Sequence, residues 1–356
     1  EYVDDWYAHN NLNRASRSWG EKPMLVQAYS LAKTTEEMHT PGQFIGGCQW
    51  HPFDHQRGYH PDPYWGGIYD AFRQKKTAYY MFESQRSDKP FVHIAHEMTQ
   101  FSDNDVTVFS NCDSVRLTTY LGAHTYKLPV NHPTAKAFNA PVVFKNAWDF
   151  WEAREYSYKK KSPQSVVMVA EGFKDGKVVC TDKRMPSRRS TKLRLYVDDM
   201  GKSLVADGSD FVVVVAEVTD DNGNVRRLAK ENIRFTIEGE GEIIGDGKDI
   251  NANPRAVEWG SAPILVRSTQ KPGKIKIHAE VQFPGTHAPT SADLEMESVA
   301  WKGAVMIGAE PVGNASSKQV NAPSSSGSSV HEFTPEQKAK MLKEVEDQQA
   351  DFGIGN

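Results

Sequence analysis

The spacing of apolar residues predicts a helix, a strand and a second helix in the first part of the chain. Apolar side chains recur at helical spacing over residues 22–39, and the run Thr-Pro-Gly at 40–42 ends that pattern. A short apolar run at residues 43–50 predicts a buried strand, and residues 65–85 return to helical spacing. In a βα-barrel, a functional loop and then a helix follow each strand in this same order.

This order leads us to interpret residues 1–90 as an α/β remnant, the last βα unit of a TIM barrel together with the helix before it. One strand cannot close a barrel, so we expect the apolar faces of residues 22–39 and 65–85 to be exposed. The chain opens on EYVDDWYAHNN, without an initiator Met or a signal peptide, which predicts a truncated or processed product.

From residue 91 onward the pattern is typical of strands. Short runs rich in β-branched residues follow one another, and an Asp-Gly turn signal at 175–176 separates two alternating stretches. We predict an immunoglobulin-like β-sandwich at 91–190 and a second one at 191–300, which makes the chain multidomain and mostly β. Strand, not helix, follows the glycines at 239, 241, 245 and 247, so we assign them to a turn or bulge.

The end of the chain has a different composition. Residues 301–333 include a stretch rich in Ser and Asn, which is typical of a flexible linker. Residues 334–356 predict a short C-terminal helix, in which Thr334 is the N-cap, Pro335 is the first helical residue and Gln337 completes a capping box.

Composition and charge narrow the classes of partner. The 356 residues are 38% hydrophobic, enough for real cores, and a net charge of −4 without a dense Lys/Arg field argues against a nucleic-acid partner. No stretch approaches the roughly 18 apolar residues of a membrane span. Cys48, Cys112 and Cys180 lie far apart and match neither a zinc spacing nor a disulfide framework, so we expect each to be a small buried hydrophobe.

The loop GGCQWHPFDHQRGYHPDPYWGG at residues 46–67 concentrates aromatic, acidic and basic side chains. Aromatic rings stack on the apolar C–H face of a sugar, and Asp, His and Arg side chains pair with its hydroxyls. We therefore predict a substrate-binding set that consists of Trp50, His51, Asp54, His55 and Arg57. The alternative is a rigid loop that is pinned by its own polar contacts.

A metal site is a further alternative for this loop. His51, His55 and His60 are possible zinc ligands, but Pro52 breaks the segment and the chain has no H-E-x-x-H motif. We predict neither a metal site nor a cofactor. A loosely bound Na⁺, Mg²⁺ or Ca²⁺ that is held by Asp and carbonyl oxygens is the alternative.

The loop and its flanks resemble a known family. The stretch GGCQWHPFDHQRGYHPDPYWGGIYDAFRQKKTAYYMFESQ is similar to the last strand, loop and helix of the barrel of glycoside hydrolase family 2, which includes β-galactosidases, β-glucuronidases and β-mannosidases. Residues 106–122 resemble the family's post-barrel sandwich, and residues 204–225 and 239–254 resemble the additional sandwich of bacterial members. The resemblance covers residues 1–300, and the loop looks most like that of bacterial β-galactosidases.

The resemblance implies a retaining mechanism with two Glu residues, one as acid and one as nucleophile. In the family the acid is a Glu on barrel strand 4, a strand that we expect to be absent from this chain. The nucleophile is a Glu at the end of strand 7, in a motif E-Y-G or E-W-G. Glu1, in EYVDDW, is one candidate, but we favour a nucleophile just upstream, which leaves the catalytic residues unknown. Glu21 is a third candidate, which we interpret as a carboxylate that opens a helix and suits its dipole.

The resemblance thus implies the C-terminal fragment of an enzyme that hydrolyses terminal β-galactosides, with a β-glucuronidase or a β-mannosidase as alternatives. It implies that the Trp50 ring forms the floor of the subsite that holds the sugar being cleaved. It also implies that the partner is an oligo- or polysaccharide and that the protein is periplasmic or extracellular in a bacterium. The resemblance does not decide whether the protein forms a homo-oligomer. We expect this chain alone to have no hydrolase activity.

The alternative function is a non-catalytic carbohydrate-binding or scaffold module. Residues 148–151, Trp-Asp-Phe-Trp, are the one aromatic cluster of the first sandwich that could form a binding platform. We favour a packing role for this cluster, between strands or against the barrel.

Overall fold

The computed structural model describes only part of the sequence. The described residues are 13–40, 42, 45–56, 63–120, 124–130, 138–160, 166–244, 253–283 and 291–303. Backbone contacts divide the chain into two units, Glu1–Lys302 and Gly303–Asn356. The predicted linker lies outside the described residues beyond residue 303, and the predicted C-terminal helix lies wholly outside them.

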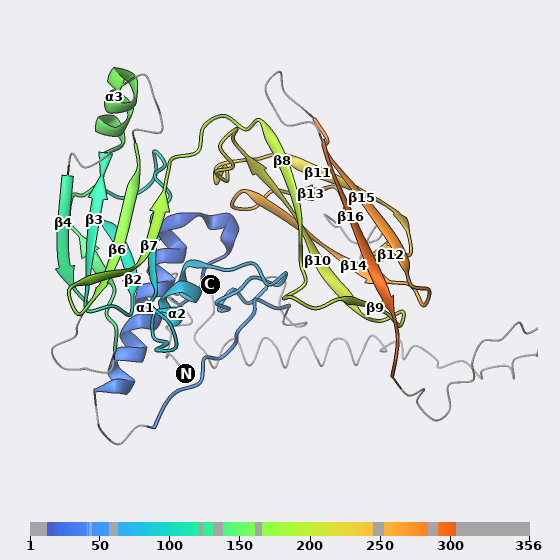
Figure 1. Cartoon of the computed structure of the whole chain (residues 1–356), viewed down its shortest axis with the longest axis horizontal. Coiled ribbons are helices and arrows are strands. Elements are labelled where there is room, and N and C mark those ends of the chain that lie inside the picture. Colours follow the sequence, from blue (N-terminus) through green and yellow to red (C-terminus); the bar gives the residue numbers. More distant parts are fainter. Residues whose placement is uncertain are drawn as a thin grey trace, which may run out of the picture. The chain divides into compact units, whose positions relative to one another are not determined.

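Two antiparallel sheets form the first β-sandwich (Figure 1). One sheet has the strand order β1–β2–β5 and the other has the order β4–β3–β6–β7. The strands are β1 (Val92–Ala95), β2 (Val106–Ser110), β3 (Ser114–Thr119), β4 (His124–Pro129), β5 (Val142–Phe144), β6 (Met168–Lys174) and β7 (Lys177–Arg184). Val108, Leu117, Trp148 and Met168 belong to the buried core of this sandwich, and helix α3 (Phe150–Lys160) follows β5.

The turn between β6 and β7 confirms the Asp-Gly signal. Lys174 pairs with Lys177, and the two residues between them, Asp175 and Gly176, have φ angles of 50° and 76°. Two consecutive positive φ angles are the geometry of a type I′ hairpin turn, for which Asp-Gly is a favoured pair.

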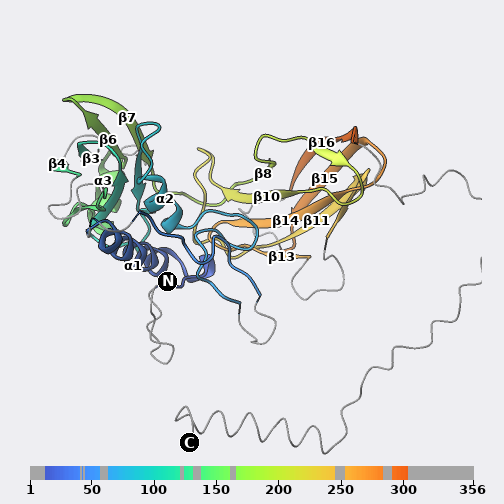
Figure 2. The same ribbon diagram turned by 90° about the horizontal axis from the view of Figure 1, so that it is seen from below.

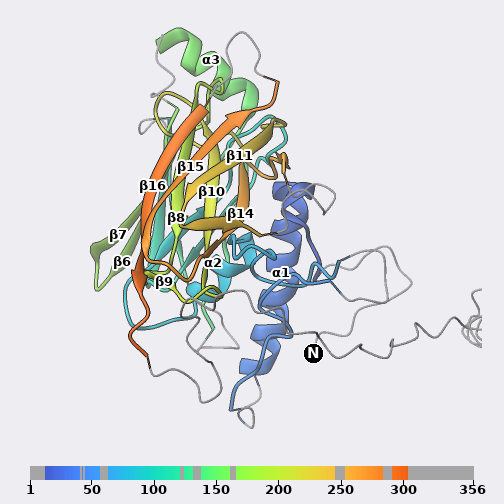
Figure 3. The ribbon, with the colours of Figure 1, turned by 90° about the vertical axis from the view of Figure 1, so that its right-hand side faces the viewer.

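The second sandwich also has two sheets, with the orders β12–β14–β10–β8 and β13–β11–β15–β16–β9 (Figure 3). The strands are β8 (Lys192–Asp198), β9 (Leu204–Ala206), β10 (Phe211–Thr219), β11 (Asn232–Gly239), β12 (Gly241–Ile243), β13 (Arg255–Ala256), β14 (Ser261–Ser268), β15 (Gly273–Val281) and β16 (Ser291–Ala300). All pairings between these strands are antiparallel except that of β16 with β9. Val214, Phe235, Ile264 and Ile277 belong to its buried core.

The glycine-rich stretch after β11 is a turn and not a phosphate loop in the part that is described. Gly239 ends β11 with a φ of 94°, and a Cβ there would lie 2.1 Å from the carbonyl oxygen of Lys274. Strand β12 begins at Gly241, after the single residue Glu240, and Gly245 and Gly247 lie outside the described residues.

Two helices cover the outer face of the sheet β1–β2–β5 (Figures 1 and 2). They are α1 (Glu21–His39), which confirms the predicted helix at 22–39, and α2 (Thr77–Glu83). Leu31 of α1 and Met81 of α2 pack in one cluster with Ala95 of β1 and Phe109 of β2. The expectation that the apolar faces of these helices are exposed is therefore wrong.

The barrel unit that the sequence suggested is not confirmed. Residues 45–50 form no strand, and the predicted helix at 65–85 is reduced to α2. Asp70 accounts for part of the difference, because its Oδ1 accepts hydrogen bonds from the backbone nitrogens of Phe72 and Gln74 and so holds a turn where a helix was expected. The segment before α2 is instead held by isolated bridges, such as the one between Phe53 and Tyr69.

Candidate functional site

A buried ion pair lies beneath the loop that the sequence singled out. The Lys76 side chain is completely buried, and its Nζ lies 2.6 Å from Oδ1 of Asp54. The same ammonium group donates to the carbonyl oxygens of Ala15 at 2.7 Å and Trp65 at 3.1 Å. Its three hydrogens thus meet three acceptors from three separate segments, which is the condition for a buried charge to be tolerated.

Asp54 points away from solvent toward this lysine. Its Oδ1 also accepts a hydrogen bond from the backbone nitrogen of Gly67, at 3.0 Å. Burial raises the pKa of Asp54 to about 6, against the opposing pull of the Lys76 charge, and burial also lowers the pKa of Lys76. At neutral pH the carboxylate stays ionised and pairs with the ammonium group.

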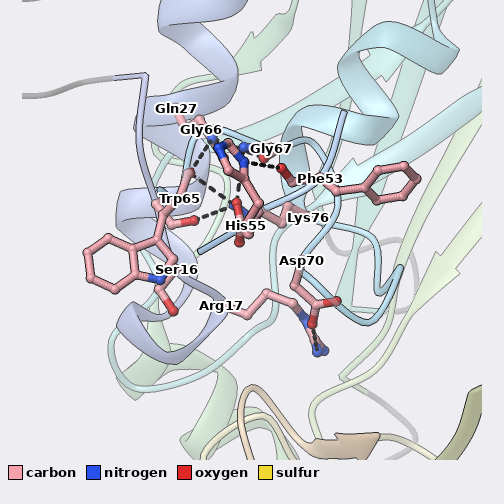
Figure 4. A network of polar contacts seen from close by, with 12 residues as sticks. Ser16, Arg17, Gln27, Phe53, His55, Trp65, Gly66, Gly67, Asp70 and Lys76 are labelled. Carbon is pink, nitrogen blue, oxygen red and sulfur yellow. Dashed lines mark hydrogen bonds and ion pairs between the residues drawn. The ribbon is translucent and has the colours of Figure 1, made fainter. Parts of the chain in front are cut away.

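Helix α1 is joined to the same loop by Gln27, which is fully buried. Its Nε2 lies 3.0 Å from the carbonyl oxygen of Asn13 and 3.2 Å from those of Trp65 and Gly67. Figure 4 shows Gln27, Trp65 and Lys76 converging on one another from α1, the loop and the segment before α2. The loop is therefore pinned from two sides by side chains that donate to its backbone.

The outer side of the loop carries a cluster of rings. Trp50 is 63% exposed, and the His51 ring lies 4.7 Å from it, centroid to centroid. The same His51 ring lies 4.3 Å from the ring of His55 and 5.6 Å from that of Tyr64. The guanidinium carbon of Arg14 sits 4.6 Å from the centre of the Tyr64 ring. We call the rings of Trp50, His51, His55 and Tyr64 the ring cluster.

The structure thus divides the predicted substrate-binding residues between two environments. Trp50, His51 and His55 lie together in the ring cluster, whereas Asp54 is on the buried side. Arg57 lies outside the described residues. A role for these residues in substrate binding stays a prediction, and for Asp54 the contacts present are those of a loop pinned from within.

Sequence reasoning missed Lys76 and Gln27. Lys76 stands in the run RQKKTAYY, within the predicted helix at 65–85, and Gln27 lies on the apolar face of α1. A polar residue on an otherwise apolar helix face is a usable signal for Gln27. Lys76 carries no such signal, because its burial depends on loop backbone that no periodicity describes.

A second buried cation joins this region to the second sandwich. Arg17 is 4% exposed; its Nη1 lies 3.1 Å from Oδ2 of Asp70, and its Nη2 donates to the Ser261 hydroxyl at 2.8 Å. Arg227, from the turn region before β11, pairs with Glu97, with 3.1 Å between Nε and Oε2. Figure 4 shows the Arg17–Asp70 contact beside the Lys76 network.

Glu21 opens helix α1, as predicted, but its carboxylate also has long-range partners. It accepts hydrogen bonds from the backbone nitrogen of Glu97 and from the hydroxyl of Ser102, both in the segment between β1 and β2. Burial is the largest cause that raises the pKa of Glu21, to about 7. The carboxyl group therefore anchors α1 to the first sandwich. Glu1, the other candidate in this sequence for a catalytic carboxylate, lies outside the described residues.

The aromatic cluster at 148–151 is split by the structure. Trp148 is 2% exposed and packs with Tyr120 and His96, whereas Trp151 on α3 is 67% exposed. The packing role that we favoured thus holds for Trp148. Trp151 is in ring contact with Phe150 and lies under the guanidinium group of Arg154, at 5.5 Å.

Two features are absent from the described part of the chain. No group of three or more His, Cys, Asp or Glu residues there could hold a metal ion, and His60, one of the three possible zinc ligands, is not described. None of the helices described is long and apolar enough to cross a membrane.

The chain is similar in sequence to glycoside hydrolases of known family. Residues 193–286 match the glycoside hydrolase family 2 C-terminal domain 5. A β-galactosidase of Thermoanaerobacter pseudethanolicus is 28% identical over 80% of this chain and 37% of its own length. A β-glucuronidase of Formosa agariphila is 26% identical over 78% of this chain and 27% of its own length. The chain thus spans about a third of the length of the curated relatives that it matches.

A solved structure supports the fold. It is a β-glucuronidase from glycoside hydrolase family 2, which superposes with a TM-score of 0.61 at 24% identity and covers 85% of this chain and 30% of that one.

Replacing Lys76 with Met should strongly destabilise the protein, because it leaves the Asp54 carboxylate buried without its counter-ion. We expect Lys76→Met to lower the free energy of unfolding by about 3–5 kcal/mol in urea denaturation. Lys145→Met is the matched control, since it breaks an exposed pair with Asp105 and should cost less than about 1 kcal/mol. Equal losses in the two variants would contradict the role given to the buried pair.

Glu21 predicts a pH dependence of stability. Its folded-state pKa, about 7, lies above the ordinary value of 4.5, so the folded state binds a proton that the unfolded state releases. Its contribution is complete below pH 4.5 and is lost as the pH rises toward 7, by about 1–3 kcal/mol. Glu21→Gln should reduce this slope in urea titrations at pH 4.5, 6 and 7.5, and an unchanged slope would refute the assignment.

Proposed function

We propose that this chain, a relative of the C-terminal part of glycoside hydrolase family 2 enzymes, supplies part of the sugar-facing surface of a retaining β-glycosidase that hydrolyses terminal β-galactosides. The observation that carries the proposal is the ring cluster, with Trp50 63% exposed above a loop whose backbone is fixed by Lys76 and Gln27. The two sandwiches act as accessory domains that support this surface.

The chemistry of the ring cluster suits a sugar. The exposed indole of Trp50 offers a flat apolar face, and the imidazoles of His51 and His55 next to it can donate or accept hydrogen bonds. A pyranose presents the complementary pair of surfaces, an apolar C–H face and a rim of hydroxyls. Because the loop is pinned from beneath, these groups are positioned before the substrate arrives, which lowers the entropic cost of binding.

The choice of a β-galactoside rests on relatives. Two of the curated relatives carry the name β-galactosidase, from Thermoanaerobacter pseudethanolicus and Bacteroides ovatus. We include in the proposal an oligo- or polysaccharide as the partner, with no nucleic acid and no resident cofactor. We also include a periplasmic or extracellular location in a bacterium.

A β-glucuronidase is the second candidate, and one contact favours it. The guanidinium group of Arg14 lies over the Tyr64 ring and so beside the ring cluster. A uronic acid differs from galactose by a carboxylate at C6, and an arginine is the side chain best suited to pair with that group. One of the curated relatives is named a β-glucuronidase.

The substrate is tested with the complete enzyme that contains this chain. Nitrophenyl β-galactoside, β-glucuronide and β-mannoside are compared at equal concentration, with the 356-residue chain alone as a second sample. We expect the galactoside to have the highest kcat/KM and the chain alone to give no turnover. A glucuronide preference of tenfold or more would replace the first candidate by the second. Glycan binding by the complete protein without hydrolysis of any substrate would overturn both.

Trp50→Ala separates a substrate contact from a structural role. In the complete enzyme we expect kcat/KM to fall by about 10²-fold, which corresponds to roughly 2.7 kcal/mol of lost transition-state stabilisation, with little change in thermal stability. Trp151→Ala is the control, because it removes an equally exposed indole from α3 without touching the loop. A Trp50 variant that unfolds, or one as active as the Trp151 variant, would show that Trp50 does not line the subsite.

A further inference from the structure

We propose that Cys112 and Cys180 are a site of oxidative cross-linking, where a small-molecule disulfide converts the two thiols into a disulfide bond. Their sulfur atoms lie 3.5 Å apart, although the residues are separated by 68 positions in the sequence. Cys112 is 3% exposed and follows β2, while Cys180 lies in β7 and is half-buried. Neither sequence position gave a reason to pair them.

The backbone around the two sulfurs leaves room for both. Gly172 of β6 pairs with Cys180 in the sheet, and the register shifts between Gly172 and Phe173. A Cβ at Gly172 would lie 2.6 Å from the sulfur of Cys112 and 2.7 Å from that of Cys180. The two thiols therefore fill the space that the missing side chain of Gly172 leaves, next to an irregularity in the strand pairing.

The cross-link would fasten the connection between the two sheets of the first sandwich to β7. Cys112 lies between the end of β2, in the sheet β1–β2–β5, and the start of β3, in the sheet β4–β3–β6–β7, and Cys180 belongs to β7 of the second of these sheets. A bridge between residues so far apart in sequence closes a long loop in the unfolded chain and restricts it strongly. The bond would also hold β7 at the sheet edge, where β6 is its one neighbour among the described strands.

The chemistry is a thiol–disulfide exchange in two steps. The Cys180 thiolate attacks one sulfur of the small-molecule disulfide, which forms a mixed disulfide and releases one small thiolate. The Cys112 thiolate then attacks the Cys180 sulfur, which forms the protein disulfide and releases the second small thiolate. Two protons leave the protein thiols and two electrons pass to the small disulfide. Burial and the Cys112 thiol raise the pKa of Cys180 to about 12, so the first step accelerates with rising pH.

The test uses the 356-residue chain with Cys48→Ser, because Cys48 is exposed and would form bonds between molecules. The reduced protein is incubated with oxidised glutathione at pH 8.5, denatured, alkylated and weighed. We expect neither cysteine to be alkylated, no glutathione adduct, and a mass about 2 Da below that of the reduced chain. Thermal unfolding of the oxidised form should occur roughly 5–15 °C higher than that of the reduced form.

Two variants distinguish a built site from chance proximity. Cys48→Ser/Cys112→Ser should stop at a glutathione adduct on Cys180, because no second thiol resolves it. Cys48→Ser/Gly172→Ala should cross-link at least tenfold more slowly, since the added methyl occupies the space of both sulfurs; circular dichroism checks that it is folded. Persistent glutathione adducts in the Cys48→Ser protein, or two alkylated thiols after oxidation, would overturn the proposal.

Discussion

The enclosure of the Lys76 ammonium group determines where the rest of the loop region can lie. A buried charge is tolerated only when each of its hydrogens has a partner, and here the partners are Asp54 and the carbonyl oxygens of Ala15 and Trp65. These groups come from three segments with no regular structure of their own, so a shift in one would leave a charge or a carbonyl unpaired. The ring cluster lies on the outer side of this pinned loop, and the proposed sugar-binding role depends on such a fixed support.

The same logic recurs in the contacts that reach the second sandwich. Arg17 bonds both Asp70 and Ser261, and Arg227 pairs with Glu97, so charged groups connect parts of the chain that each have a separate apolar core. Hydrophobic packing stabilises each sandwich without selecting a partner, whereas hydrogen bonds with directional geometry select one arrangement. Glu21 adds a titratable contact of this kind between α1 and the first sandwich.

The sequence predicted those features that local periodicity and turn chemistry determine. Helix α1 and the Asp175-Gly176 hairpin were predicted because a 3.6-residue apolar repeat and a left-handed turn pair are visible in a short window. The stretch before α2 was assigned wrongly, because Asp70 stabilises a turn that helical spacing does not reveal. The burial of Asp54 and the approach of Cys112 to Cys180 depend on residues distant in sequence, which no pattern within one segment encodes.

The sheet β1–β2–β5 is covered on one face by the sandwich core and on the other by α1 and α2, and all five side chains of β2 are buried. An antiparallel sheet with one face in solvent commonly alternates apolar residues on its buried face with polar residues on its exposed face. Here Phe109 and Ala95 point outward only because helices lie over them. The sandwich therefore depends on the helical segment before it, because a cut near residue 90 that separated the two would expose this apolar face to solvent.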